Sequence, residues 1–214
     1  MLGNLTNNKL AFEIIAIVCG YLLGSVNFAI VVSKMSGQGD IRDYGSGNAG
    51  ASNITRTMGW QYGIITVLGD VLKGTLAVFI GTRLVPGAGG MLAGAGAFFG
   101  HRWPIFFDMR GGKSVATLGG VFLGLDYRIA LWFLGVWAFL VLTTRYMSTA
   151  ASLGVWILPF ASKFYRPDLE SIGAFAILLS WCVFFFHREN RKRMRKGLEP
   201  MVSFKLHPKE EKYG

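Results

Sequence analysis

Four cationic side chains interrupt an apolar stretch in the middle of the chain: His101, Arg102, Arg110 and Lys113. A Gly-Gly pair stands directly before the lysine, and glycine lets consecutive backbone N–H groups point outward without an obstructing Cβ. The residues after the lysine, Ser-Val-Ala-Thr, are typical of a helix start, where free N–H groups and the positive dipole end favour phosphate. We interpret residues 100–117 as a phosphate cradle at a membrane surface.

The sequence Gly112-Lys113-Ser114 imitates the end of a nucleotide-binding P-loop. That motif needs a glycine five residues before Gly112, where Phe107 stands, and it needs a preceding strand, which the sequence does not suggest. We therefore set a nucleotide P-loop aside.

A second polar segment, residues 33–57, offers further hydrogen-bond donors. Its core reads Gly-Ser-Gly-Asn-Ala-Gly-Ala-Ser-Asn over residues 45–53, and Arg56 closes it. A flexible turn is the alternative to a binding loop. The arginine and the flanking apolar segments favour a binding loop held near the bilayer.

The composition is that of an integral membrane protein. Of 214 residues, 52% are hydrophobic and only 16% charged, against about 25% charged in soluble domains. Residues 188–214 hold nine Lys/Arg and four Asp/Glu, half of the net charge of +10. Anionic lipid headgroups explain such a tail more simply than nucleic acid does. We expect one membrane-embedded domain over residues 1–214, with 188–214 as its basic cytoplasmic tail, and no nucleic-acid partner.

The apolar segments predict an all-α membrane protein of about seven transmembrane helices. The two short segments, 90–99 and 115–125, should be central or bracketed by longer helices, and the glycine spacing of the first allows close helix approach. The sixth span, residues 150–164, contains Pro159, where the helix can kink. The basic tail places the C-terminus in the cytoplasm and the N-terminus outside, so the polar loops share the cytoplasmic face. The expected spans are 11–32, 61–85, 90–99, 115–125, 129–144, 150–164 and 172–186.

A few polar residues lie inside these spans. Asp70 and Lys73 are three residues apart and can pair on one helix face, which we favour over direct substrate contact. Asn27 should face protein or water rather than lipid. Cys19 and Cys182 lie in apolar stretches without metal-ligand spacing and are expected to be packing residues, not a disulfide.

Three ordered motifs resemble the signature loops of the bacterial PlsY family, and the likeness extends from about residue 20 to residue 200. They are Gly45-Ser46-Gly47-Asn48-Ala49-Gly50-Ala51-Ser52-Asn53, then Gly100-His101-(x)2-Pro104-(x)-Phe106-Phe107 with Gly111-Gly112-Lys113, then His187-(x)2-Asn190-(x)2-Arg193-(x)3-Gly197-(x)-Glu199. The sequence departs from the family pattern at Asn27, Ala49 and Ser114, which bears on loop rigidity more than on chemistry.

The resemblance implies a multi-pass enzyme of the bacterial inner (cytoplasmic) membrane, with an active site facing the cytoplasm. It implies transfer of a fatty acyl group from acyl phosphate to the sn-1 hydroxyl of glycerol 3-phosphate, giving lysophosphatidic acid and inorganic phosphate for phospholipid biosynthesis. It implies an enzyme that requires neither coenzyme A nor a metal, so no cofactor is expected. Expected partners are both substrates, membrane lipids and the enzyme that produces the acyl phosphate.

Within that framework, two phosphates need holding. We assign Lys113 and the backbone of Gly111, Gly112 and Ser114 to one phosphate, together with Ser46, Gly47, Asn48, Asn53 and Arg56. We assign His187, Asn190 and Arg193 to the other phosphate or the glycerol, with Arg145 and Ser148 as weaker candidates, Ser148 for a catalytic role. His101 either contacts substrate, caps its loop or is structural.

The general base stays open from the residues alone. His187 has a suitable ordinary pKa near 6.5, whereas a phosphate with a second pKa of about 6 could accept the hydroxyl proton itself. We favour substrate assistance without a covalent acyl-enzyme, with His187 orienting or binding. The His-(x)4-Asp pair of coenzyme-A-dependent acyltransferases is missing, because six residues separate His101 from Asp108.

Two other classes compete with an acyltransferase. A transporter of phosphate compounds could use basic, glycine-rich loops beside broken helices. A membrane scaffold could use the same loops to bind anionic lipid. The sequence has no evident inverted repeat, and its polar groups are expected on one face, which disfavours the transporter.

Overall fold

The computed structural model describes the backbone of residues 2–202 and the side chains of residues 8–202. In this part the chain forms only helices, with no strand. They are α1 (Leu2–Ser25), α2 (Phe28–Met35), η1 (Ile41–Asp43), α3 (Ala51–Met58), α4 (Trp60–Leu84), α5 (Gly89–Arg102), η2 (Ile105–Phe107), α6 (Val115–Leu125), α7 (Tyr127–Thr144), α8 (Met147–Gly154), α9 (Ile157–Tyr165), α10 (Glu170–Phe186) and α11 (Arg188–Arg195).

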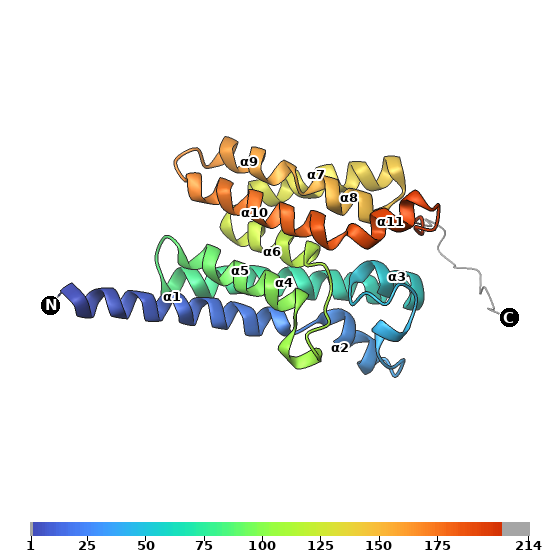
Figure 1. The fold of residues 1–214 in the computed structure, drawn as a ribbon, viewed down its shortest axis with the longest axis horizontal. Coiled ribbons are helices and arrows are strands. Elements are labelled where there is room, and N and C mark those ends of the chain that lie inside the picture. The colour runs from blue at the N-terminus through green and yellow to red at the C-terminus, as the bar shows by residue number, and fades with distance from the viewer. Residues whose placement is uncertain (1, 203–214) are drawn as a thin grey trace.

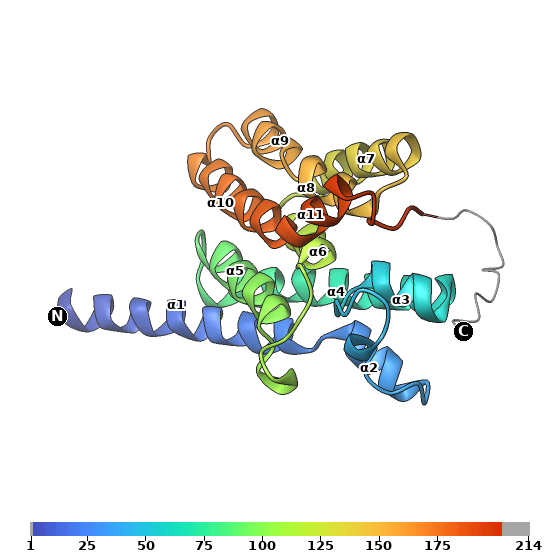
Figure 2. The same ribbon diagram turned by 45° about the vertical axis from the view of Figure 1, so that its right-hand side comes forward.

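The helices form two groups joined by α6, as Figures 1 and 2 show. Helices α1, α4 and α5 pack against one another, and α7, α8, α9 and α10 make the second group. Helix α6 packs against α4 and α5 on one side and against α7 on the other. The two short apolar helices, α5 and α6, therefore lie between longer ones, as predicted.

Within residues 2–202, three helical stretches are long and apolar enough to cross a membrane by themselves: Asn8–Met35, Trp60–Leu84 and Tyr127–Thr144. There is a fourth if α10 and α11, which are bent by 46° from one another, are taken as one span. Large apolar side chains such as Leu68, Phe139 and Leu142 point outward, which suits contact with lipid. The all-α membrane architecture is confirmed, while seven crossings stay a prediction.

The first predicted span is broken near its end. Helix α1 stops at Ser25 and α2 begins at Phe28, with Asn27 between them. The Asn27 Oδ1 accepts the Ile30 N–H at 3.2 Å, which caps α2, and its Nδ2 donates to the Ala49 carbonyl at 3.2 Å. Asn27 is fully buried and faces protein, as predicted.

The predicted kink near Pro159 is a complete break. Helix α8 ends at Gly154 and α9 begins at Ile157. A proline ring clashes with the carbonyl four residues earlier, here that of Val155, so the interruption falls upstream of the proline itself.

Glycines allow a close helix contact between α1 and α5. A Cβ on Gly20, Gly24, Gly96 or Gly100 would come between 2.0 and 2.3 Å from a backbone oxygen of the facing helix. The predicted packing role is therefore confirmed, and it fixes where α5 ends and the polar loop begins. Cys19 and Cys182 are both free, as predicted.

Two polar segments are more helical than expected. Residues 51–58, predicted as part of a loop, form α3, because Ile54 is fully buried against Ile30 and Ile41. The first residues of the basic tail form α11, while residues 203–214 of the predicted tail lie outside the described residues.

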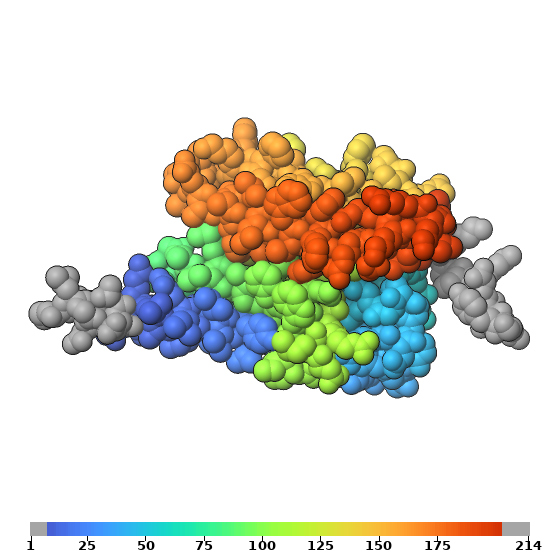
Figure 3. All heavy atoms as spheres, viewed as in Figure 1, coloured from blue at the N-terminus to red at the C-terminus, as the bar shows by residue number. Residues whose placement is uncertain are grey.

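Segments that are distant in sequence meet at one end of the molecule. In Figure 3 the α11 region in red, the α5–α6 loop in lime and the 41–58 segment in cyan adjoin one another. The turn between α7 and α8 lies at this same end in Figure 1. The predicted gathering of polar loops at one end is present in the fold.

Candidate functional site

A cavity of about 380 Å³ lies where these three segments meet. Six of its lining residues are among those predicted from the sequence: Ser46, Gly47, Asn48, Gly111, Lys113 and Arg193. The structure thus brings members of all three polar segments to one cavity.

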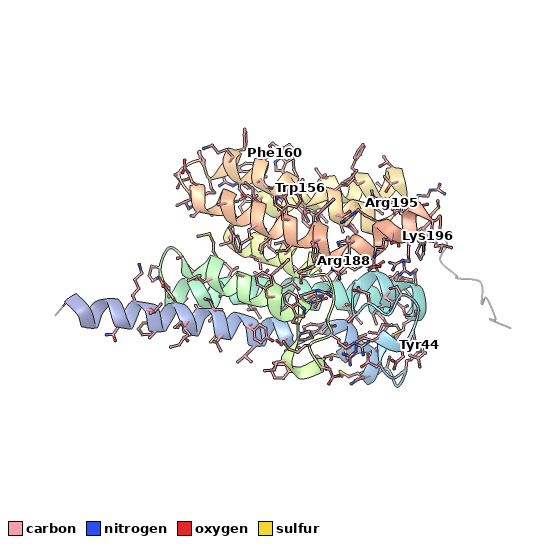
Figure 4. The ribbon with its side chains drawn as sticks, viewed as in Figure 1. Tyr44, Trp156, Phe160, Arg188, Arg195 and Lys196 are labelled. Carbon is pink, nitrogen blue, oxygen red and sulfur yellow. The ribbon has the colours of Figure 1, made fainter. Side chains whose placement is uncertain are left out.

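The cavity wall is strongly cationic. Lys113 and Arg193 are joined there by four further arginines, Arg42, Arg102, Arg110 and Arg188, against a single acidic residue, Glu189. Figure 4 shows Arg188 near the junction of α10 with α11. Trp103, Met109 and Phe186 make an apolar part of the wall. Such a site suits a ligand with more than one negative charge and an apolar end.

Lys113 is held inside this cluster by the tail. Its Nζ donates a hydrogen bond to Asn190 Oδ1. Burial lowers the pKa of the Lys113 ammonium to about 8, and the positive charges of Arg193, Arg102 and Arg56 lower it too, against the opposing effect of Glu199. Without an anion the charged lysine is therefore disfavoured, and a bound phosphate would remove that repulsion.

Glu199 organises the tail side of the site. Its Oε1 accepts a hydrogen bond from Asn190 Nδ2 at 2.6 Å, and its Oε2 accepts one from Arg193 Nε at 2.9 Å. Burial raises the pKa of the Glu199 carboxyl, but the hydrogen bonds from Asn190 and Ser148 and the charge of Arg193 more than offset this and leave the pKa below its ordinary value. The carboxylate stays ionised and fixes both partners. Asn190 itself is buried and holds Lys113 instead of lining the cavity.

The loop before α3 is shaped by Asn53. This residue is fully buried, and its Oδ1 accepts the Ser46 N–H at 3.0 Å while its Nδ2 donates to the Tyr44 carbonyl at 2.9 Å. Asn53 therefore presents Ser46 to the cavity without lining it. Arg56 does not line the cavity either, and one of its guanidinium nitrogens lies 3.4 Å from Ser46 Oγ. Burial lowers the pKa of Arg56, and the charge of Arg193 lowers it further, against the effect of Glu199.

The glycine pair contributes differently from the expected backbone cradle. The Gly111 and Gly112 N–H groups donate to the carbonyls of Arg102 and His101, each at 3.1 Å, so these amides are occupied within the protein. A Cβ on Gly111 would come 2.0 Å from the His101 oxygen. The pair therefore lets the loop lie directly on the end of α5, and Lys113 is delivered to the cavity from there.

Ser114 also turns away from the cavity. It adopts a left-handed conformation, φ 61°, and its Oγ donates to the Phe98 carbonyl at 2.7 Å. Its hydroxyl serves the packing of the loop on α5.

His101 lies outside the cavity, in a buried group with Asp70 and Lys73. The Lys73 Nζ is 2.8 Å from Asp70 Oδ1 and 2.9 Å from His101 Nδ1. The predicted structural pairing of Asp70 and Lys73 is confirmed, and His101 joins that pair instead of lining the predicted substrate site.

His187 and Ser148 are both buried and do not line the cavity. His187 Nδ1 is 2.8 Å from the Val183 carbonyl, which assigns the proton to Nδ1 and leaves Nε2 as an acceptor. Arg145 is exposed and left-handed, φ 61°, and its carbonyl accepts the Val202 N–H at 2.8 Å. Its backbone ties down the tail, and its side chain is not at the cavity.

Arg42, like Arg188, lines the cavity although sequence reasoning did not single it out. Its guanidinium forms a two-point contact with Asp40, at 2.9 and 2.8 Å, and donates to the Phe107 carbonyl at 2.7 Å. It also lies 3.3 Å from Asp108. Arg42 therefore fastens the first polar loop to the second. Its only signal in the sequence is an arginine beside two aspartates just before the glycine-rich run.

Comparison with known proteins gives the family of the chain. A family model described as glycerol-3-phosphate acyltransferase matches residues 14–197. Proteins of that name from Brucella anthropi and Nitrobacter winogradskyi are 39% and 41% identical to the chain over 190 and 193 residues. The two alignments cover 89% and 90% of this chain and 93% and 97% of the relatives.

Solved structures give the same result for the fold. Crystal structures of PlsY, an integral membrane glycerol 3-phosphate acyltransferase, match with TM-scores of 0.82 for the glycerol 3-phosphate form and 0.80 for the lysophosphatidic acid form. They are 32% and 30% identical to this chain, and each match covers 89% of it, with 96% and 95% of the known chains. With its helical architecture, its cationic cavity and these similarities, the chain belongs to the PlsY family of integral membrane glycerol-3-phosphate acyltransferases.

Proposed function

We propose that this chain transfers a fatty acyl group from acyl phosphate to the sn-1 hydroxyl of glycerol 3-phosphate, giving lysophosphatidic acid and inorganic phosphate. The observation that carries the proposal is the cavity in which six cationic side chains from three segments face one another beside Trp103, Met109 and Phe186. Both substrates bring phosphate, and one brings an apolar chain, so a cationic cavity with an apolar wall matches the pair.

The chemistry requires binding more than it requires a protein nucleophile. The glycerol oxygen attacks the acyl carbonyl, the carbonyl–phosphate bond breaks, and inorganic phosphate leaves with its electron pair. Two anions must be held close together for this attack, and Lys113, Arg102 and Arg193 supply the opposing charge. Alignment of two bound reactants can lower a barrier by about 7–11 kcal/mol in favourable cases.

Within this proposal, the roles divide between contact and support. Lys113, Arg193, Ser46 and the Gly47–Asn48 backbone contact phosphate. Asn53 and Arg56 hold Ser46, and Asn190 and Glu199 hold Lys113 and Arg193. The glycine pair Gly111–Gly112 and Ser114 support the loop from behind.

The proton of the attacking hydroxyl goes to a phosphate oxygen of the donor. His187 is buried with its Nδ1 occupied by the Val183 carbonyl. It orients the α10–α11 junction, and its Nε2 can accept one hydrogen bond from a substrate hydroxyl. The buried Ser148 hydroxyl lies beside Glu199, whose pKa it lowers, and we assign it to the glycerol side of the site. We assign no covalent acyl-enzyme.

We also propose seven crossings, with α1–α2, α4, α5, α6, α7, α8–α9 and α10 as the spans. The N-terminus then lies outside and the loop end faces the cytoplasm of a bacterial inner membrane. Consecutive spans run back and forth in Figure 1, which supports this path. The basic residues of α11 fit the cytoplasmic side. One membrane-embedded domain accounts for residues 1–214, and an acyl-phosphate-producing enzyme is the expected neighbour.

The test supplies purified protein with acyl phosphate and radiolabelled glycerol 3-phosphate, without coenzyme A. Formation of labelled lysophosphatidic acid is the expected result. A membrane transporter would instead accumulate label in sealed vesicles without forming product, and a lipid-binding scaffold would do neither. Acyl transfer only on addition of acyl-coenzyme A would refute the proposed donor.

A further inference from the structure

Asp70, Lys73 and His101 form a buried charged group that the proposed chemistry does not use. Their side chains are between 2% and 4% exposed, and none lines the cavity. Charged groups at this depth are costly to bury and persist where they have a function or a paired structural role. Asp70 and Lys73 of α4 meet His101 at the end of α5, and this meeting point suggests what the group does.

The contacts of Lys73 fix the state of the histidine. The Lys73 Nζ lies 2.8 Å from Asp70 Oδ1, 2.8 Å from the Val26 carbonyl and 2.9 Å from His101 Nδ1. The hydrogen bonds of the ammonium go to the Val26 carbonyl and to His101 Nδ1, whereas Asp70 Oδ1 pairs with Lys73 by charge and also lies 3.3 Å from His101 Nδ1. An ammonium has donors only, so a charged Lys73 requires Nδ1 to accept and places the imidazole proton on Nε2, at the far edge of the ring.

That far edge lies against Gly112 of the second loop, and Gly112 in turn lies against the Ala49 carbonyl of the first loop. A Cβ placed on Gly112 would come 2.2 Å from His101 Nε2 and 2.5 Å from the Ala49 carbonyl oxygen. Gly112 precedes Lys113 in the second loop, and Ala49 follows Asn48 in the first. The His101 carbonyl also accepts the Gly112 N–H at 3.1 Å. One residue thus supports Gly112 from two sides.

We infer that His101 is a positioning residue for Lys113: anchored through Nδ1 by the Asp70–Lys73 pair, it holds Gly112 and the Ala49 carbonyl in register, so that the lysine enters the cavity at a fixed place. The inference rests on the proposed function, because it gives Lys113 its phosphate role. His101 touches no substrate and acts through the loop.

The acidity of Lys113 reports on this positioning. Its pKa of about 8 depends on burial and on the charges around it, which are Arg193 and Glu199 from the tail segment, Arg102 from α5 and Arg56 from α3. Phosphate binding needs the protonated amine, so kcat/KM for glycerol 3-phosphate falls as pH rises through that value. A loosened loop exposes the amine to water, and its pKa moves up toward the ordinary 10.5.

Two substitutions separate the two edges of the ring. In His101→Asn the short amide retains an acceptor for Lys73 but does not reach Gly112. In His101→Gln the longer amide reaches the far edge but gives up the contact with Lys73. We expect His101→Asn to have the higher melting temperature of the two variants and to lose at least tenfold in kcat/KM for glycerol 3-phosphate. The fall of its kcat/KM at alkaline pH, its alkaline limb, should move upward by about one pH unit or more. His101→Gln is expected to be the less stable variant, with the limb unmoved and the higher kcat/KM.

A control and an independent variant complete the test. Thr75→Val removes another buried hydrogen bond of α4, to the Gly120 carbonyl at 2.9 Å, and should leave the pH profile unchanged. Gly112→Ala pushes the loop off His101 while Asp70, Lys73 and His101 all keep their own side chains, and it should reproduce the upward shift even if an amide variant fails to fold. Activity that simply follows stability across the His101 variants, or an unmoved limb in Gly112→Ala, would overturn the inference. Absence of acyl transfer by the wild-type protein would instead refute the proposed function.

Discussion

Replacing Lys113 by methionine should have opposite effects on stability and activity. Methionine is similar in length and carries no charge, so it fills the same space without opposing Arg193, Arg102 and Arg56. If the lysine is present to bind phosphate, its charge destabilises the folded protein when no phosphate is bound. A lysine present for folding would behave in the reverse way.

The magnitude follows from the acidity of the amine. A pKa lowered from 10.5 to about 8 means that the charged form costs the folded protein about 3 kcal/mol at neutral pH, at about 1.4 kcal/mol per unit. The variant also loses the hydrogen bond between Lys113 and Asn190, which reduces its gain in stability by about 1 kcal/mol. The net gain of about 2 kcal/mol raises the melting temperature by roughly 4–8 °C for a chain of this size.

The assay is thermal unfolding of the purified protein in detergent across pH, with and without glycerol 3-phosphate. Below pH 8, Lys113→Met should exceed wild type in stability by the whole of this amount. The difference should narrow as pH rises through about 8, because the folded wild type then loses the proton that the unfolded chain keeps until about 10.5. Glycerol 3-phosphate should stabilise wild type more than the variant. A lower melting temperature for Lys113→Met at pH 7 would refute the reasoning.

Three further outcomes are expected. The kcat/KM of the wild type for glycerol 3-phosphate should fall as pH rises through about 8, when Lys113 loses its proton, and a flat profile to pH 9.5 would contradict this. Glu199→Gln should lower kcat/KM about tenfold or more, because a neutral amide cannot accept two strong hydrogen bonds from Asn190 and its neighbouring arginine; unchanged steady-state kinetics would count against that network. Gly111→Ala should cost about 1–3 kcal/mol of stability, since its Cβ would sit 2.0 Å from the His101 oxygen, and a melting curve matching wild type would show that the loop can shift freely.

Local sequence patterns predicted much of this molecule because their physical requirements are local. The spacing of Asp70 and Lys73 places them on one helix face, and the two are 2.8 Å apart in the structure. Glycines four apart predicted that α5 packs closely on a neighbouring helix, and the structure shows that α1 is such a neighbour. The cost of burying an amide in lipid placed Asn27 against protein.

The rest could not be predicted because it depends on contacts between distant segments. Arg42 acquires its role from the Phe107 carbonyl, 65 residues away. His101 and Asn53 have the chemistry of ligands, yet tertiary contacts occupy their polar atoms. Helix α3 was hidden because a single buried isoleucine, Ile54, holds an otherwise polar segment.

The most direct test of the shared phosphate site is titration calorimetry of glycerol 3-phosphate with the purified protein at pH 7. A single site is expected in the wild type, with affinity at least tenfold weaker in Lys113→Met and in a variant of the opposite loop, Ser46→Ala with Arg56→Ala. Equal affinity in wild type and both variants would show that the ligand binds elsewhere, and the account of one cavity formed by three segments would fail.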